Sequence, residues 1–203
     1  MKLAVFGDEF CHGEGTFGGF IADKLNIEYA DWTLPDTSNQ RIFQDVINYV
    51  CTHHPQENNH ILLIGWTDPA KVDVYLDSRY YTFQKDRKSY PHLMVNKLHI
   101  ADRYFFDSNL VMNDWATMIV SLQGMLNFMG VKYYMFNTST SILNNDLTQK
   151  KCAAIDTKYY WNPMSAKHTF KRFCDDRKIT DVPMKQKTWG KQLMIKIREA
   201  NLL

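Results

Sequence analysis

The sequence predicts an α/β fold in which helices cover both faces of a parallel sheet of about five strands. Two observations support this prediction. Short apolar segments alternate with amphipathic segments along the first third of the chain. One of these segments, HILLIGW at residues 60–66, is an uninterrupted apolar run. Such runs are typical of strands that are buried on both faces of a parallel sheet.

The first elements along the chain are a strand, a helix and a second strand. KLAVF at 2–6 is apolar and ends at Gly7, so it is expected to be a short buried strand. Residues 18–26 carry apolar side chains at helical spacing. Residues 27–34 then have the composition of a strand, which Pro35 ends.

The next helix is the most clearly amphipathic segment of the chain. Residues 38–54 place apolar side chains three and four positions apart, with Ser38 as the expected N-cap and Pro55 beyond the end. The strand at 60–66 follows. Three strands that alternate with two helices predict a doubly wound, three-layer sheet of the flavodoxin-like kind.

The second half of the chain is less regular. Residues from about 68 to 107 are aromatic, charged and poorly periodic, so we expect an excursion with short helices over the edge of the sheet. A long helix is predicted at about 108–129, with Gly130 at its end. The remainder is predicted as a fourth strand at 131–137, a loop-rich part at 138–164, and helices at about 165–177 and 188–199.

Composition limits the class of protein. A chain of 203 residues, 45% of them hydrophobic, is expected to close one core, so residues 1–203 are predicted to be a single domain. The formal net charge of +2 gives no global attraction to nucleic acid or anionic lipid. Four scattered cysteines predict a reduced, cytosolic protein. No apolar segment is long enough to suggest a membrane span, and no leader pattern is recognised.

Three polar segments follow predicted strands and are expected to face one crevice, because ligands bind at the carboxyl ends of parallel strands. They are GDEFCHGEG at 7–15, PDTSNQR at 35–41 and GWTDP at 65–69. These segments resemble the SGNH (GDSL-like) hydrolases, and especially the small proteins of that superfamily from tailed bacteriophages, with their GDSFC opening, SNxRI segment and apolar strand ending in WT.

The resemblance implies that the catalytic blocks are degraded. The family's serine nucleophile maps onto Glu9, after Asp8. Its general-base histidine maps onto Asn162, whose amide does not titrate near neutral pH. In the block that contributes an oxyanion donor, Asp68 is kept and Thr67 takes the place of the donor asparagine, which is expected to be a milder change because its hydroxyl can still donate. A histidine further along, His168, is also kept in this alignment.

The sequence therefore predicts a non-catalytic protein without a cofactor that acts as a binding or assembly module. The resemblance implies a phage protein, in the virion or in the cytoplasm of the infected bacterial host. One alternative is an active esterase or deacetylase on a carbohydrate or lipid acyl group, with His168 as the base and Glu9 or Ser165 as an unconventional nucleophile. Another alternative is a metal-dependent hydrolase that uses Asp8, Glu9 and His12, since carboxylates suit Mg²⁺ or Mn²⁺.

Two further features concern binding. Asn39 and Arg41 begin the second helix, and Arg41 is expected either to clamp a carboxylate or phosphate or to tie neighbouring loops together. Residues 75–92 mix aromatic and basic side chains. This mixture favours a contact with a protein partner, which includes other virion proteins or a second copy of the chain. Single-stranded nucleic acid or carbohydrate is the alternative ligand. Cys11 is expected to be a packing residue.

Overall fold

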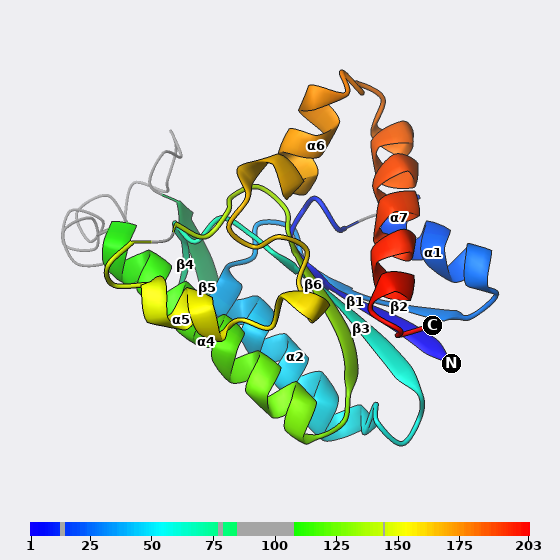
Figure 1. Cartoon of the computed structure of the whole chain (residues 1–203), viewed down its shortest axis with the longest axis horizontal. Coiled ribbons are helices and arrows are strands. Elements are labelled where there is room, and N and C mark those ends of the chain that lie inside the picture. The colour runs from blue at the N-terminus through cyan, green and yellow to red at the C-terminus, as the bar shows by residue number, and fades with distance from the viewer. Residues whose placement is uncertain (13–14, 77–78, 85–107, 144) are drawn as a thin grey trace.

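The computed structural model describes residues 1–12, 15–76, 79–84, 108–143 and 145–203 (Figure 1). A twisted parallel sheet runs through the middle of the molecule, and helices lie on both of its faces (Figure 1). The predicted three-layer α/β class is therefore confirmed.

Four parallel strands form the sheet in the described part of the chain, in the order β2-β1-β3-β6. They are β1 (Lys2–Gly7), β2 (Glu28–Thr33), β3 (His60–Trp66) and β6 (Lys132–Asn137). The prediction of about five strands was slightly too high. At the place of a fifth strand, beside β6, the structure has an isolated parallel bridge between Met135 and Tyr160.

The pairing register aligns the carboxyl ends of the strands. Gly7 pairs with Thr33, and Trp66 pairs with Asn137. The segments that follow these strands therefore start from one edge of the sheet. This alignment is the structural basis for a site at that edge.

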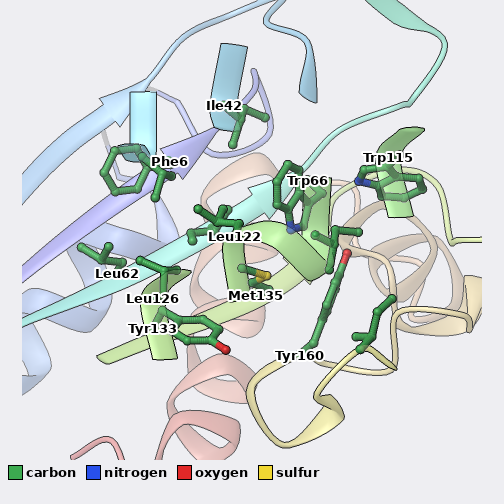
Figure 2. Packing of buried hydrophobic residues seen from close by; sticks show 14 of the residues in the cluster. Phe6, Ile42, Leu62, Trp66, Trp115, Leu122, Leu126, Tyr133, Met135 and Tyr160 are labelled. Atoms are coloured by element: carbon green, nitrogen blue, oxygen red, sulfur yellow. The ribbon is translucent and has the colours of Figure 1, made fainter. Parts of the chain in front are cut away.

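Alternate side chains of each strand enter two separate cores. Ala4, Phe6, Leu62 and Ile64 contribute to the core on the face covered by α2 (Asn39–His53) and α4 (Ser108–Phe128), part of which Figure 2 shows. Their neighbours, such as Val5, contribute to the core on the opposite face. That face is covered by α1 (Phe17–Leu25), α6 (Phe170–Asp176) and α7 (Val182–Glu199). This double burial explains why the strands read as continuous apolar runs.

The structure divides the helix predicted at about 165–177. A short 3₁₀ turn, η2 (Ala166–His168), comes first, and α6 starts after Thr169. Thr169 has an extended backbone, and its Oγ1 accepts the Arg172 N–H at 3.3 Å. A side-chain cap of this kind starts a new helix instead of continuing the old one.

The last helix is longer than predicted. α7 begins at Val182 because Asp181 caps its N-terminus, accepting the Met184 N–H at 2.9 Å, and Pro183 fits the first turn. Trp189, Leu193 and Ile197 are all buried and lie four residues apart on one face. Two other short elements lie between β6 and α6: α5 (Gln149–Ala154), beside α4, and the 3₁₀ turn η1 (Thr157–Tyr159).

The start of the predicted excursion differs from the expectation of short helices. β4 (Lys71–Leu76) and β5 (Arg79–Gln84) form an antiparallel pair, in register from Lys71 with Gln84 to Leu76 with Arg79. Their β-branched and aromatic residues favour this conformation. The rest of the excursion, 85–107, lies outside the described residues. In the described part of the chain, no helix combines the length and apolar character needed to cross a bilayer.

Candidate functional site at the strand ends

Asp8 lies at the centre of the strand-end site and is fully buried. Three segments bind its carboxylate. The hydroxyl of Thr67, which follows β3, donates to Oδ2, and the hydroxyl of Thr138, which follows β6, donates to the same oxygen at 3.1 Å. The Phe10 N–H donates to Oδ1 at 3.1 Å. Two of the segments predicted to face one crevice, those after β1 and β3, therefore meet at Asp8, and the segment after β6, which was not part of that prediction, joins them.

Lys71 supplies the positive charge of this site, and the sequence analysis did not identify it. Its side chain is only 4% exposed, although it carries an ammonium group. The Nζ atom lies 2.8 and 2.7 Å from the two carboxylate oxygens of Glu9, and 3.8 Å from Oδ2 of Asp8. Glu9 is thus bound through both carboxylate oxygens to a buried cation.

A turn at Asp68 directs Lys71 back toward Asp8. Oδ1 of Asp68 accepts the Ala70 N–H at 2.9 Å, and its carbonyl accepts the Lys71 N–H at 3.0 Å. Asp68 therefore positions the lysine. The signal in the sequence that could have indicated the ion pair between Lys71 and Glu9 was a lysine three residues after Asp68.

The local charges shift the pKa of Asp8. Burial is the largest cause, and it raises the pKa together with the neighbouring Glu9 carboxylate; the Thr67 hydroxyl and Lys71 act in the opposite direction. The net result is a pKa of about 6, compared with an ordinary value of 3.8. Asp8 is therefore a buried acid whose charge depends on its partners.

Glu9 is not placed at a helix N-terminus. The helix that follows, α1, begins only at Phe17 and is capped by Thr16, whose Oγ1 accepts the Gly19 N–H at 3.4 Å. In addition to Lys71, Glu9 accepts the N–H of Asp36 at 3.3 Å, in the loop after β2. The electrostatic partner of Glu9 is thus a side chain from another loop.

Asn39 joins the start of α2 to the end of β3. Its Oδ1 accepts the Thr67 N–H at 2.8 Å and its Nδ2 donates to the Thr67 carbonyl at 3.1 Å, both within the interior. Arg41 forms an ion pair with Asp45 on its own helix, at 3.0 Å between Nε and Oδ1. Asn39 thus connects two neighbouring loops, a role that was considered for Arg41 from the sequence. Ligand binding by either residue stays a prediction.

His12 lies beside the end of β2. Its Nδ1 is 3.0 Å from Oγ1 of Thr33, and that hydroxyl in turn contacts Oδ1 of Asp31 at 2.5 Å. Among the residues that the structure describes, no group of three or more histidine, cysteine, aspartate or glutamate side chains is placed to hold a metal ion. The ammonium of Lys71 already lies against the carboxylates of Asp8 and Glu9.

The residues of the last block lie in a separate group. Nδ1 of His168 is 2.8 Å from Oγ of Ser165. Asn162 has a left-handed backbone with φ of 39°, and its carbonyl accepts the Ser165 N–H at 3.0 Å. Among the described residues, no hydrogen bond connects Asn162 or His168 to Glu9. The structure thus pairs His168 with Ser165.

Cys11 packs between the ends of β1 and β3, as expected. It is fully buried, and burial raises the pKa of its thiol well above the ordinary value. A Cβ atom on Gly7 would lie 2.5 Å from its Sγ atom, and one on Gly65 would lie 2.8 Å from it. Both positions therefore require glycine, because the thiol fills the space where a larger side chain would project.

Gln186 of α7 also holds the loop after β1, and the sequence analysis did not identify it. Its Oε1 accepts the Phe17 N–H at 3.0 Å, and its Nε2 donates to the carbonyl of Phe10 at 2.9 Å. The loop that carries Asp8 and Glu9 is thus connected to the C-terminal helix.

The fold and site together define a three-layer α/β protein in which a buried lysine pairs with a partly exposed glutamate at the carboxyl ends of the parallel strands. No protein-family model and no curated protein matches this sequence. Among solved structures, the chain is similar to a protein assigned to the lipolytic G-D-S-L family from Desulfitobacterium hafniense DCB-2, with a TM-score of 0.49 and 10% identity over 100% of this chain and 99% of that chain.

A second similar structure is the acetyl xylan esterase AlAXEase, with a TM-score of 0.42 and 9% identity over 97% of this chain and 84% of that chain. The first description names the family that the sequence segments resemble. At TM-scores below 0.5, neither likeness carries an argument about the activity of this chain.

Proposed function

We propose that the strand-end site is structural and that this protein is a non-catalytic binding or assembly module. The observation that carries the proposal is the contact of the buried Lys71 ammonium with both oxygens of Glu9. Acyl transfer needs an attacking group that a neighbouring base activates. At this position the chain has a carboxylate that is neutralised by a lysine and fixed by a backbone N–H.

The position of the general base supports the same proposal. Asn162 cannot accept and return a proton near neutral pH. The histidine of the same segment, His168, is hydrogen-bonded to Ser165. Nucleophile and base of the family's mechanism are thus both replaced.

The biological setting of the proposal rests on the sequence segments that resemble tailed-phage proteins. We propose a protein partner, either another virion component or a second copy of the chain, and action in the virion or in the cytoplasm of the infected host. Residues 75–92 are the proposed contact, with nucleic acid or carbohydrate as the alternative ligand; the side chains of this segment lie outside those that the structure describes. Light scattering on the purified chain tests the second-copy version, because a monomer at all concentrations contradicts it.

Hydrolysis of p-nitrophenyl acetate tests the absence of catalysis. The parent protein is expected to release nitrophenol at the rate of the buffer blank, and a Glu9→Gln variant is expected to give the same rate. The proposal would be contradicted if the parent hydrolysed the ester faster than the buffer blank and the Glu9→Gln variant lost this activity. The melting temperature of each variant shows whether it is folded under the assay conditions.

A second candidate is an esterase that uses Ser165 and His168, as the sequence alternative suggested. The distance of 2.8 Å between the Ser165 hydroxyl and the His168 ring favours it. Both residues belong to one local turn, three positions apart, so the contact also serves to order that turn. In the same assay, this candidate predicts parent turnover that Ser165→Ala and His168→Ala each remove and that Glu9→Gln leaves unchanged.

A further inference from the structure

A pocket of about 370 Å³ lies between the segment after Tyr160 and the two helices α6 and α7. The helices stand next to each other in Figure 1. Its volume is within the range of small-molecule sites. Its wall contains Trp161, Lys167, Phe173, Asp176, Arg177 and Lys196. Asp8, Glu9 and Lys71 are not among the lining residues, so this pocket is distinct from the strand-end site.

The floor of the pocket is apolar and firmly held. Trp161 and Phe173 are 6% and 4% exposed, respectively. The ring of Trp161 stacks on Trp189 with 4.5 Å between centroids, and Phe173 meets the same ring edge-on at 5.1 Å. Trp189 itself is fully buried. A floor built in this way keeps its shape when a ligand enters.

The rim of the pocket is cationic. Lys167, Arg177 and Lys196 contribute three positive charges, and Asp176 is the one carboxylate among the described lining residues. Asp176 is already paired with Arg172, outside the pocket, at 2.8 Å. Lys196 is paired with Glu199 at 2.6 Å. Among the described residues, none of the ion pairs includes Lys167. The charge at the rim is therefore incompletely neutralised.

Arg177 is positioned before any ligand arrives. Its guanidinium lies over the Phe173 ring, 3.7 Å from the centroid, and its Nη1 donates to the Phe173 carbonyl at 3.4 Å. These contacts fix the plane of the group and leave further N–H donors. A planar, fixed guanidinium suits a carboxylate or phosphate, which it can bind through two oxygens.

Further polar groups complete the wall. Asn162, His168 and Gln192 line the same pocket and can donate to or accept from a polar substituent. We propose that this pocket binds a small molecule in which an oxyanion group, carboxylate or phosphate, is attached to a ring. The oxyanion contacts Arg177 and Lys167, and the ring lies against Trp161. The proposal does not depend on whether the strand-end site is catalytic.

NMR titration of the full chain with three ring-bearing probes tests the proposal. Phenyl phosphate and benzoate carry the two oxyanions, and benzyl alcohol is the uncharged control. We expect at least one of the anions to shift the Trp161 indole signal and the amide signals of Arg177 and Lys167, with a dissociation constant on the order of 1 mM. The tighter of the two anions identifies the preferred group. Benzyl alcohol is expected to bind at least about tenfold more weakly.

Two variants and a matched control locate the binding. Arg177→Gln and Lys167→Gln are each expected to weaken binding of the tighter anion about tenfold, because each removes a charge-assisted hydrogen bond. Lys171→Gln removes an exposed charge from α6, between Lys167 and Arg177 in the sequence but outside the pocket lining, and is expected to leave the affinity unchanged. No binding up to about 10 mM, shifts that lie elsewhere, or an equal effect of Lys171→Gln would overturn the proposal.

Discussion

Lys71 neutralises the carboxylates of Asp8 and Glu9, which lie close together and would otherwise repel each other. Its Nζ atom contacts Glu9 at 2.7 Å and Asp8 at 3.8 Å, and its side chain is almost completely removed from water. Breaking such a pair from one side leaves a carboxylate without a counter-charge in the interior. The stability of the loop after β1 therefore depends on one lysine from β4.

Replacing Lys71 by methionine keeps the length of the side chain and removes its charge. We expect Lys71→Met to lower the free energy of unfolding by about 1–2 kcal/mol, because the buried carboxylate of Asp8 loses the cation beside it, whereas Glu9, whose side chain is 40% exposed, remains partly solvated. Urea unfolding measures this change. Lys191→Met, at an exposed position on α7, is the control and is expected to change the free energy by less than about 0.5 kcal/mol.

A double variant separates the lost charge pair from lost packing. Glu9→Gln in the Lys71→Met background removes the repulsion and is expected to recover part of the lost stability. Strict additivity of the two single changes, or a loss below about 0.5 kcal/mol for Lys71→Met alone, would contradict the role assigned to this pair.

The raised pKa of Asp8 predicts a pH dependence of stability. The folded protein holds the Asp8 proton up to a pH of about 6, whereas the unfolded chain releases it near 3.8. The contribution of this group to stability is therefore fully present below 3.8 and is lost as the pH rises through about 6. The free energy of unfolding of the parent, relative to Asp8→Asn, is expected to fall over that interval.

The ¹³C shift of the Asp8 carboxyl measures the same titration directly. A midpoint at pH 4 or below, together with a stability difference that does not change with pH, would show that Asp8 is not the shifted group.

At the residue scale, the sequence predicted only part of the site. It placed Asp8, Glu9 and Thr67 near one another because strand ends are ordered by the topology of a parallel sheet. It did not identify Lys71, because the lysine reaches the site through the turn at Asp68 into a hairpin that was expected to be helical. It paired Ser165 with His168 only as an alternative, and the local turn η2 brings these two side chains into contact.

At the scale of elements, α2 and β3 are connected by the two hydrogen bonds between Asn39 and Thr67. Both residues are buried, at 2% and 0% exposure. Ser38 adds an N-cap to the helix and donates its hydroxyl to Asp73 of β4 at 2.8 Å. The start of α2 is thus the point where helix, sheet and hairpin meet.

Asn39→Ala is expected to lower the free energy of unfolding by about 2–4 kcal/mol, because the N–H and carbonyl of Thr67 would remain buried without partners. Chemical denaturation checks the value. Asn48→Ala, at an exposed position of the same helix, is the matched control, with an expected change within about 0.5 kcal/mol. An effect of Asn39→Ala as small as that of the control would show that the connection does not stabilise the fold.

Elements with strong periodicity were predicted well, and capped or broken ones were not. The predicted strand at 60–66 coincides with β3, and the predicted helix at 38–54 differs from α2 by one residue at each end. The prediction of one continuous helix at 165–177 was wrong at Thr169, because the side chain of this residue caps the start of a new helix. The start of α7 was missed although Asp181 and Pro183 form a recognisable N-terminal signal.

At the scale of the molecule, one sheet separates two cores, and each core is closed by a different set of helices (Figure 1). Continuous apolar strands predicted this layering, because both of their faces had to be covered. The number of strands could not be predicted as well: the expected fifth strand had no segment assigned to it, and residue 160, in the part predicted as loop, makes a single bridge beside β6. A segment of one paired residue has no periodicity to recognise.

The same layering separates the two sites of the molecule. The strand-end site lies among the loops that follow β1, β3 and β6, and the cationic pocket lies between α6 and α7. The proposals for the two sites can therefore be tested independently, since Glu9 and Arg177 belong to different sites. A change at one site is expected to leave the other unaffected.

Reaction with a fluorophosphonate tests most directly the claim that the chain has no activated nucleophile. This reagent transfers its phosphonyl group to an activated serine hydroxyl and releases fluoride, so intact-mass spectrometry detects one added group per chain. The account predicts that the mass of the folded parent protein stays unchanged after incubation. A stoichiometric adduct that disappears in Ser165→Ala would contradict it.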